Sequence, residues 1–501
     1  MTFLKKNITL FEDHTQSYYE WKKRKFQKMP LVHIDAHLDF AFFAVKKPVQ
    51  ALEEAKSFDE LKRDLEKYLG KCRSNQQIDK QENIGNYIYP AMKDGLVSDF
   101  YWVIPGKLSN NTKILNDKVF LKDPYRGGIK YESRGKVFRG KIYNQKFMIC
   151  SIDKITVSEP VLLDIDLDYL MYKLGEEKSS DKSKIKGKNI ERKPWMYPKE
   201  FVETLIKKFP HPAFITIAYS VNGGYTPILY KFLGDEIYLR LAGFTKSDKK
   251  LSDLLDKKNI AIRKKNISAL DKIVLEIGET KIPGSFKKRF LAHTYFWLFY
   301  LTGKAKYYCG SVALDKSYRA KDNNYGWEYL KIGNFKKAQS EFERILKADP
   351  LNKYALLGIS QIFARDGFYE KAYNSLKKAD NPDREVYLNL ANYLCDLKRY
   401  KQADFYLSKV KVLLGFGYYL KARTLIGLRP LNKKSAINCL KTAVLSGFCI
   451  SRVWKEAVKV LTAADCEYSF FETRYNEYKN MRLKSSCRGK PKKQYYERTK
   501  F

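Results

Sequence analysis

The sequence predicts an α/β domain with a mainly parallel sheet covered by helices on both faces, followed by an all-α array of helical repeats. In the first half, apolar runs typical of strands alternate with amphipathic stretches, as in parallel sheets. In the second half a short aromatic pattern recurs at intervals of 34 and 31 residues. The 501-residue length suits two or three domains. We expect the α/β domain at 1–235, a helical connector at 236–320, the repeats at 321–480 and a disordered basic tail at 481–501.

The strand pattern of residues 31–36 runs into a cluster of polar side chains. Residues 35–39 read Asp-Ala-His-Leu-Asp. Alternate side chains of an extended strand share one face, so Asp35, His37 and Asp39 point the same way. Two carboxylates and an imidazole at one spot need a counter-charge, which a divalent cation supplies. A strand edge with solvated polar residues is the alternative for these three residues alone.

A second apolar run, Val161–Leu163, is followed by carboxylates at 164, 166 and 168. A buried parallel strand reads as a continuous apolar run, and ligands of open α/β sheets bind at carboxyl ends of strands. Because Asp164 and Asp166 follow the run directly, we expect them to bind metal; Asp166 with Asp168 is the alternative register. The expected ligands are His14, Asp35, His37, Asp39, Asp164 and Asp166. Two imidazoles and four carboxylates suit two divalent ions, manganese before others, and the absence of cysteine from these motifs argues against structural zinc.

A third strand is expected at 213–220 and runs into a glycine-containing segment. The paired glycines Gly223 and Gly224 permit a tight turn or close approach of the backbone to a ligand. We expect these glycines, with Ser220 and Tyr225, to contact the substrate. An ordinary strand-to-helix turn is the alternative.

These motifs together resemble the ureohydrolase superfamily, which includes arginase and agmatinase, and within it the peptide arginases. The matching segments are Glu12 to His14, Asp35 to Asp39, Asp164 to Tyr169 and Ile215 to Pro227. The resemblance implies a three-layer α/β/α fold shared with deacetylases and two manganese ions, one carboxylate of the Asp-x-Asp motif bridging both. It implies hydrolysis of arginine side chains within a peptide to ornithine and urea. The chain departs from the superfamily in lacking the Gly-Gly before His14 and an acidic residue within 221–227 for the guanidinium group.

Several roles and rival functions stay open from the sequence. Asp168 is a candidate for proton transfer or support of the metal shell, and His33 or His211 for a proton shuttle; a structural histidine is the alternative for each. A deacetylase-like hydrolase would hold one zinc ion with an Asp-His-Asp set. A catalytically vestigial scaffold is the third reading.

The second half resembles tetratricopeptide repeats. Gly333-Asn-Phe-Lys-Lys-Ala is echoed from Gly367 and, more loosely, from Lys398. Phe342 and Pro350 stand where such a repeat has its later aromatic residue and closing proline. Because stacked helix pairs make concave peptide-binding surfaces, we expect the repeats to recruit a peptide substrate or another protein partner. A generic helical bundle is the alternative.

Composition also bears on nucleic-acid binding, on the redox state of the cysteines and on membrane insertion. The net charge of +39 comes from basic residues spread along the chain, which favours solvated lysine faces over a specific nucleic-acid surface. The eight cysteines form no Cys-x-x-Cys pair, as expected for reduced thiols in the cytoplasm. The N-terminus shows no continuous apolar stretch, so we expect no signal peptide. The apolar run 290–300 is too short to span a bilayer and predicts a buried helix.

Overall fold

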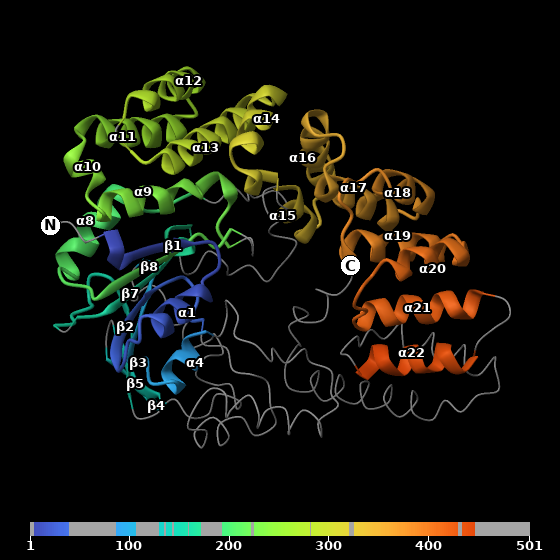
Figure 1. Ribbon diagram of the computed structural model, residues 1–501, viewed down its shortest axis with the longest axis horizontal. Coiled ribbons are helices and arrows are strands. Elements are labelled where there is room, and N and C mark those ends of the chain that lie inside the picture. Colours follow the sequence, from blue (N-terminus) through green and yellow to red (C-terminus); the bar gives the residue numbers. More distant parts are fainter. Residues whose placement is uncertain are drawn as a thin grey trace. The chain divides into compact units, whose positions relative to one another are not determined.

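The computed structural model describes residues 5–39, 87–106, 130–134, 137–142, 145–158, 160–171, 193–221, 225–280, 282–319, 325–428 and 433–445. These residues fall into two compact units, the first ending at Tyr325 and the second beginning at Gly326 (Figure 1). The helices between 236 and 320, which the sequence predicts as a connector, lie in the first unit. The predicted amphipathic helix at 51–70 and the basic tail lie outside the described residues.

The first unit is built on an eight-stranded sheet in the order β1-β8-β7-β2-β3-β6-β5-β4 (Figure 1). In the part of the sheet that runs β1-β8-β7-β2-β3-β6, every neighbouring pair is parallel. At the other edge, β5 pairs antiparallel with both β6 and β4. The mainly parallel sheet predicted from the sequence is therefore confirmed, with an antiparallel edge added. The strands are β1 (Ile8–Phe11), β2 (Met29–Ile34), β3 (Val97–Ile104), β4 (Lys130–Arg134), β5 (Val137–Ile142), β6 (Gln145–Ser151), β7 (Leu162–Asp166) and β8 (Phe214–Ala218).

The central strands are buried on both faces, as their sequences predict. All five residues of β7 and all five of β8 are buried, in keeping with continuous apolar runs of parallel strands. The register places His33 of β2 opposite Asp164 of β7, and Asp164 opposite Thr216 of β8. Three polar side chains thus meet in the buried centre of the sheet, and such groups are stable there only when hydrogen-bonded.

Helices flank the sheet and continue beyond its last strand. The predicted buried helix around 290–300 is confirmed as part of α13 (Gly284–Thr302), which buries Phe290, Trp297 and Phe299. None of the described helices combines the length and apolar character that a bilayer crossing requires. The other α-helices are α1 (Gln16–Lys23), α4 (Ile88–Lys93), α6 (Asp168–Met171), α8 (Pro198–Lys208), α9 (Phe232–Leu241), α10 (Phe244–Ser247), α11 (Lys249–Lys264), α12 (Ile267–Glu276) and α14 (Ala305–Leu314).

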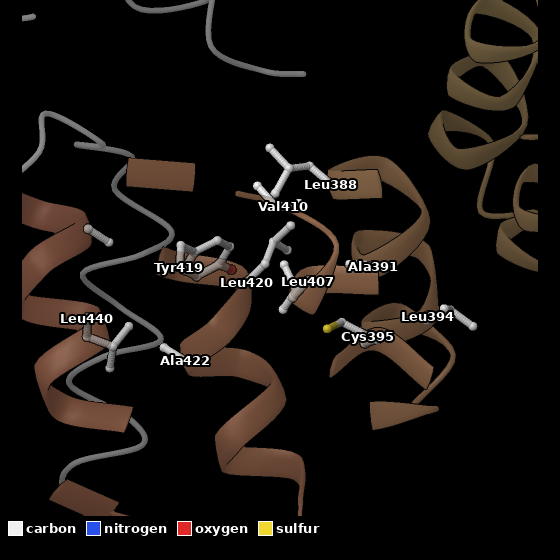
Figure 2. Packing of buried hydrophobic residues seen from close by; sticks show 12 residues of the cluster. Leu388, Ala391, Leu394, Cys395, Leu407, Val410, Tyr419, Leu420, Ala422 and Leu440 are labelled. Carbon is white, nitrogen blue, oxygen red and sulfur yellow. The ribbon is translucent and has the colours of Figure 1, made fainter. Parts of the chain in front are cut away.

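The second unit is all-α in its described part. Consecutive helices contact one another along the chain, and α19 also contacts α21. Figure 2 shows one of its apolar cores, where Leu394 of α19, Leu407 of α20, Leu420 of α21 and Leu440 of α22 are at most 3% exposed. Burial of each such leucine contributes roughly 1.5–3 kcal/mol, so neighbouring helices stabilise one another. The helices are α15 (Tyr325–Lys331), α16 (Phe335–Ala348), α17 (Lys353–Arg365), α18 (Tyr369–Leu376), α19 (Arg384–Asp396), α20 (Tyr400–Ser408), α21 (Gly415–Gly427) and α22 (Lys433–Leu445).

The repeated sequence segments lie at the starts of alternate helices, α16, α18 and α20. Phe335, Tyr369 and Tyr400 each begin a helix, after Gly333, Gly367 and Lys398, which all have positive φ. The ring of Phe342 packs against two glycines of neighbouring helices, Gly326 and Gly358. An α/β unit followed by an all-α unit is therefore what the structure shows, and the tetratricopeptide assignment stays a prediction.

Candidate metal centre

The polar cluster lies at the carboxyl ends of four adjacent strands, β1, β8, β7 and β2. His14 follows β1, Asp35 follows β2, and Asp166 is the last residue of β7. Asp168 begins α6, and its backbone N–H donates to Oδ1 of Asp166 at 2.9 Å. Because these strands are parallel neighbours, residues far apart in sequence meet at one edge of the sheet.

One group of candidate ligands surrounds Nδ1 of His14. This nitrogen lies 3.1 Å from Oδ2 of Asp166, 3.3 Å from Oδ2 of Asp35 and 3.4 Å from Oδ2 of Asp39. The four ligand atoms lie within 4.8 Å of one another. An imidazole and three carboxylates in this arrangement can hold a divalent cation.

A second group consists of Asp35, His37 and Asp168. Nδ1 of His37 lies 2.5 Å from Oδ2 of Asp168 and 3.7 Å from Oδ1 of Asp35. Asp35 therefore faces the first group with Oδ2 and the second with Oδ1. A carboxylate shared in this way is able to bridge two cations.

Charge and burial also fit cations at this edge. Burial raises the pKa of Asp35, and the nearby carboxylates of Asp168, Asp39 and Asp166 raise it further. Nδ1 of His14 and Oδ2 of Asp35 are buried and have no hydrogen-bond partner among the described residues. Burial lowers the pKa of His37, but Asp168 outweighs burial and raises it to about 9. Crowded carboxylates and orphaned ligand atoms are the features that a bound cation would satisfy.

Asp164 has a different environment from the other carboxylates. Its Oδ1 accepts hydrogen bonds from Ser17 Oγ at 2.8 Å and Thr216 Oγ1 at 2.5 Å. Its Oδ2 accepts from Tyr87 OH at 2.5 Å and lies 3.0 Å from Nδ1 of His33. Burial raises the pKa of Asp164, but the charge and hydrogen bonds of His14, with those of His33, outweigh burial and leave the pKa far below its usual range. Asp164 is therefore a buried carboxylate held by three hydroxyl donors, those of Ser17, Thr216 and Tyr87.

The structure brings five of the six predicted ligands into the two groups that share Asp35. Asp164 also reaches Nε2 of His14, at 3.0 Å, and forms a third group with His14 and His33. Asp168, predicted to move protons or support the metal shell, stands beside His37 in the second group. This geometry favours the Asp166 and Asp168 register over the Asp164 and Asp166 register.

Of the other predicted site residues, some lie at the cluster and others lie away from it. His33 is fully buried between Asp164 and Asp35, whereas His211 is exposed and precedes β8, at the opposite end of the strand from the cluster. Ser220 donates to Oδ2 of Asp166 at 2.5 Å, so its hydroxyl holds a candidate ligand. The ring of Tyr225 lies 5.0 Å from the ring of His37. Gly223 and Gly224 lie outside the described residues.

Two non-glycine residues at this edge adopt left-handed backbone conformations. Asp39 has φ 47° and Ser220 has φ 49°. Such conformations are uncommon for residues with a Cβ and cost on the order of 1–3 kcal/mol each, and they concentrate at functional sites. The backbone N–H of Val221 donates to Oε1 of Glu12, and that of Ser220 to the Glu12 carbonyl, which fixes the second turn.

Sequence reasoning missed Ser17, Tyr87 and Thr216, the hydroxyl donors to Asp164. Thr216 and Ser220 stand at even spacing in Ile-Thr-Ile-Ala-Tyr-Ser, so the two-residue period of a strand could have placed both on the face of the cluster. Ser17 lies one helical turn after His14, which is a weaker signal. No pattern in the sequence singles out Tyr87.

Comparisons with known proteins identify no relative: no family model matches the chain, and no curated protein matches its sequence.

Proposed function

We propose that the protein is a dinuclear-metal amidinohydrolase, which hydrolyses arginine side chains in a peptide or protein to ornithine and urea. The observation that supports two ions is the shared Asp35, with one oxygen toward each ligand group. Four carboxylates, Asp35, Asp39, Asp166 and Asp168, carry the charge that two divalent ions would balance. Oxygen and imidazole ligands suit manganese.

When bound, a pair of such ions supplies Lewis acidity and a water-derived nucleophile at neutral pH. The chain's own residues would then fix the geometry. Ser220 and the N–H of Asp168 hold the two oxygens of Asp166, and the N–H of Ala36 holds Oδ1 of Asp168 at 3.1 Å. Preorganised ligands of this kind cost no reorganisation during the reaction.

Two parts of this proposal, the arginine substrate and the three-layer α/β/α fold, are supported by the resemblance of the four motifs to peptide arginases. Hydrolysis adds water across the guanidinium carbon, breaks its bond to the side-chain nitrogen, and releases urea; the departing amine takes up a proton. Asp168 is the proposed proton-transfer residue, and His33 is the second candidate.

We further propose that the second unit recruits the peptide substrate. We also propose that the protein acts in the cytoplasm, where free thiols stay reduced; these are Cys150, Cys309, Cys395 and Cys439.

A deacetylase-like zinc hydrolase is the second candidate, because Asp35, His37 and Asp168 form an Asp-His-Asp group by themselves. Metal stoichiometry separates the two functions. One ion per chain favours the deacetylase-like enzyme and two favour the amidinohydrolase. A catalytically vestigial scaffold would bind no divalent ion.

The test combines elemental analysis with product detection. Purified protein is loaded with manganese and incubated with arginine-containing peptides, and the expected products are urea and a peptide lighter by about 42 Da, the mass of CH2N2. Asp35→Asn should lose both ions and the activity. Asp153→Asn is the matched control, because Asp153 follows β6 and contacts Ser151 and Lys154 instead of the cluster. Two bound ions without urea release would refute the arginine substrate, and free arginine tested in parallel shows whether a peptide is needed.

A further inference from the structure

The longest stretch of the chain without an acidic residue lies in the second unit. Residues 405–455 contain no aspartate or glutamate, and they carry ten lysines and arginines. The described part of this stretch covers the end of α20, all of α21 and α22. A basic surface that has no acidic residues of its own attracts anionic partners.

The last two acidic residues before this stretch already serve cations of α21. Oδ1 of Asp404 pairs with Nζ of Lys421 at 2.5 Å. Oδ1 of Asp396 pairs with the guanidinium group of Arg423 at 2.8 Å. The acidic residues nearest in sequence are therefore engaged inside the unit, and the outer cations of the stretch must find their counter-charge elsewhere.

The turn between α20 and α21 is held by two apolar anchors. Val410 is 8% exposed and lies in the core that Figure 2 shows, and Leu413 packs against the same core. The residues beside these anchors are exposed: Lys409, Lys411, Val412 and Leu414. Neither lysine pairs with an acidic side chain among the described residues. The anchors fix which side chains of the turn face outward, so little order has to be gained when a partner binds.

Exposed apolar side chains are concentrated at the same place. Val412 is 63% and Leu414 38% exposed, and Phe405 of α20 is 56% exposed with Nζ of Lys409 4.9 Å from its ring centre. These are three of the nine large apolar side chains that are exposed in the described part of the chain. Exposed apolar groups that lie together mark interaction sites. The α20–α21 patch is defined by Phe405, Lys409, Lys411, Val412 and Leu414.

We propose that the α20–α21 patch binds an acidic peptide segment of a partner protein. Carboxylates of the peptide pair with Lys409 and Lys411, and an apolar side chain of the peptide packs against Val412 and Leu414. The lysines supply charge complementarity, and the aliphatic side chains supply apolar area that a phosphate backbone does not use. Single-stranded nucleic acid fits less well, because it needs rings for stacking and the one aromatic ring of the patch, Phe405, lies under Lys409.

The patch contains none of the candidate metal ligands, so binding there needs no metal ion. If the second unit also recruits the substrate of the proposed amidinohydrolase, the recruited peptide has its acidic segment apart from the target arginine. A protein that releases urea but does not bind acidic peptides would keep the proposed function and refute the role of the patch.

The test is the fluorescence anisotropy of a labelled glutamate–leucine peptide with the full-length protein. Matched peptides replace every glutamate by glutamine or every leucine by serine, and each replacement and added salt should weaken binding. Equal binding of the glutamine peptide would overturn the proposal. Single-stranded RNA and vesicles of anionic lipid are added as competitors, and tighter binding of either at the same lysines would also overturn it.

Charge reversal locates the binding site. Lys409→Glu combined with Lys411→Glu should weaken the glutamate–leucine peptide about 10-fold or more, because two attractions become repulsions. Lys377→Glu combined with Lys378→Glu is the matched control, since Lys377 follows α18 as Lys409 follows α20 and both control lysines are exposed. The control should stay within about threefold of wild type. Equal loss in both variants would reduce binding to net charge and overturn the patch.

Two further measurements test the apolar part and the wild-type protein. Val412→Ser combined with Leu414→Ser should weaken the glutamate–leucine peptide about 3- to 10-fold and leave the glutamate–serine peptide unchanged. No change with either peptide would refute the apolar contact. Carbodiimide coupling, which joins a lysine amine to a peptide carboxylate with loss of water, should occur at Lys409 and Lys411 of the wild type. Coupling spread evenly over the lysines of the second unit would overturn the proposal without any variant.

Discussion

The free energy of unfolding of the first unit is expected to rise between pH 7 and pH 10 because of one buried lysine, Lys258. Lys258→Met should remove this rise. Lys258 lies in α11 and is 1% exposed, with its ammonium group over the rings of Phe232 and Phe290 at 4.5 and 3.9 Å. Burial lowers its pKa to about 7, although Glu236 and Asp235 act in the opposite direction. Glu236 is already bound by Arg240 and Asn259.

The sign and size of this pH dependence follow from the pKa values of Lys258 in the folded and unfolded states. In the unfolded chain Lys258 has an ordinary pKa of 10.5, so between pH 7 and 10.5 the unfolded state binds the extra proton. Stability therefore increases with pH in this window, by at most about 1.4 kcal/mol per unit for this one group. From pH 7 to pH 9 the difference between wild type and Lys258→Met should change by about 2 kcal/mol.

Urea unfolding at pH 7, 8 and 9, followed by tryptophan fluorescence, measures this change. Four of the six tryptophans, Trp21, Trp102, Trp195 and Trp297, belong to the first unit and dominate the signal that the Lys258→Met comparison uses. Lys257→Met is the control, since Lys257 is 63% exposed and pairs with Glu276 at 3.5 Å. Parallel pH curves for wild type and Lys258→Met would refute a buried lysine of lowered pKa.

Three further predictions test the packing, the caps and the metal centre. Gly358→Ala should destabilise the second unit by roughly 1–3 kcal/mol in urea unfolding, because the added Cβ would meet the Phe342 ring; a stabilised variant would contradict this packing. Asp248→Ala should cost about 1 kcal/mol, because Asp248 caps α11 by accepting from the N–H of Leu251 at 3.0 Å, and an unchanged urea midpoint would argue against the cap. Removal of divalent ions with EDTA should lower the Tm of the first unit, and manganese at a hundred times its Kd should restore about 2.7 kcal/mol; a Tm independent of manganese would argue against a native-state site.

The sequence carried enough information to predict the sheet and where its ligands gather. The apolar run before Asp164 depends on local strand geometry, which a single sequence displays. The expected strand alternation of Asp35, His37 and Asp39 is wrong, because β2 ends at Ile34 and Asp39 has φ 47°, so the loop after β2 brings these side chains to the cluster. The expected strands, the mainly parallel sheet and the buried helix α13 all appear in the structure. The expected glycines at 223 and 224 stay predictions.

The register of the three carboxylates could not be predicted, because it depends on where β7 stops. Asp164, Asp166 and Asp168 alternate equally well, but β7 ends at Asp166 and α6 begins at Asp168. Asp164 is left inside the sheet opposite His33 and Thr216. Its hydroxyl donors lie 147, 77 and 52 residues away along the chain, so only the folded sheet brings them to Asp164.

The place of β1 in the sheet bears on when the centre can form during synthesis. β1 pairs with β8, and Ile8 stands opposite Ile215, 207 residues later. His14 is therefore synthesised before the rest of the cluster but is among the last of it to reach its place. A nascent chain that has not yet released β8 holds Asp35, His37 and Asp39 but no partner strand for β1. Under the proposed function, metal uptake at the first ligand group would report completion of the sheet, and a chain cut short before residue 218 would lack it.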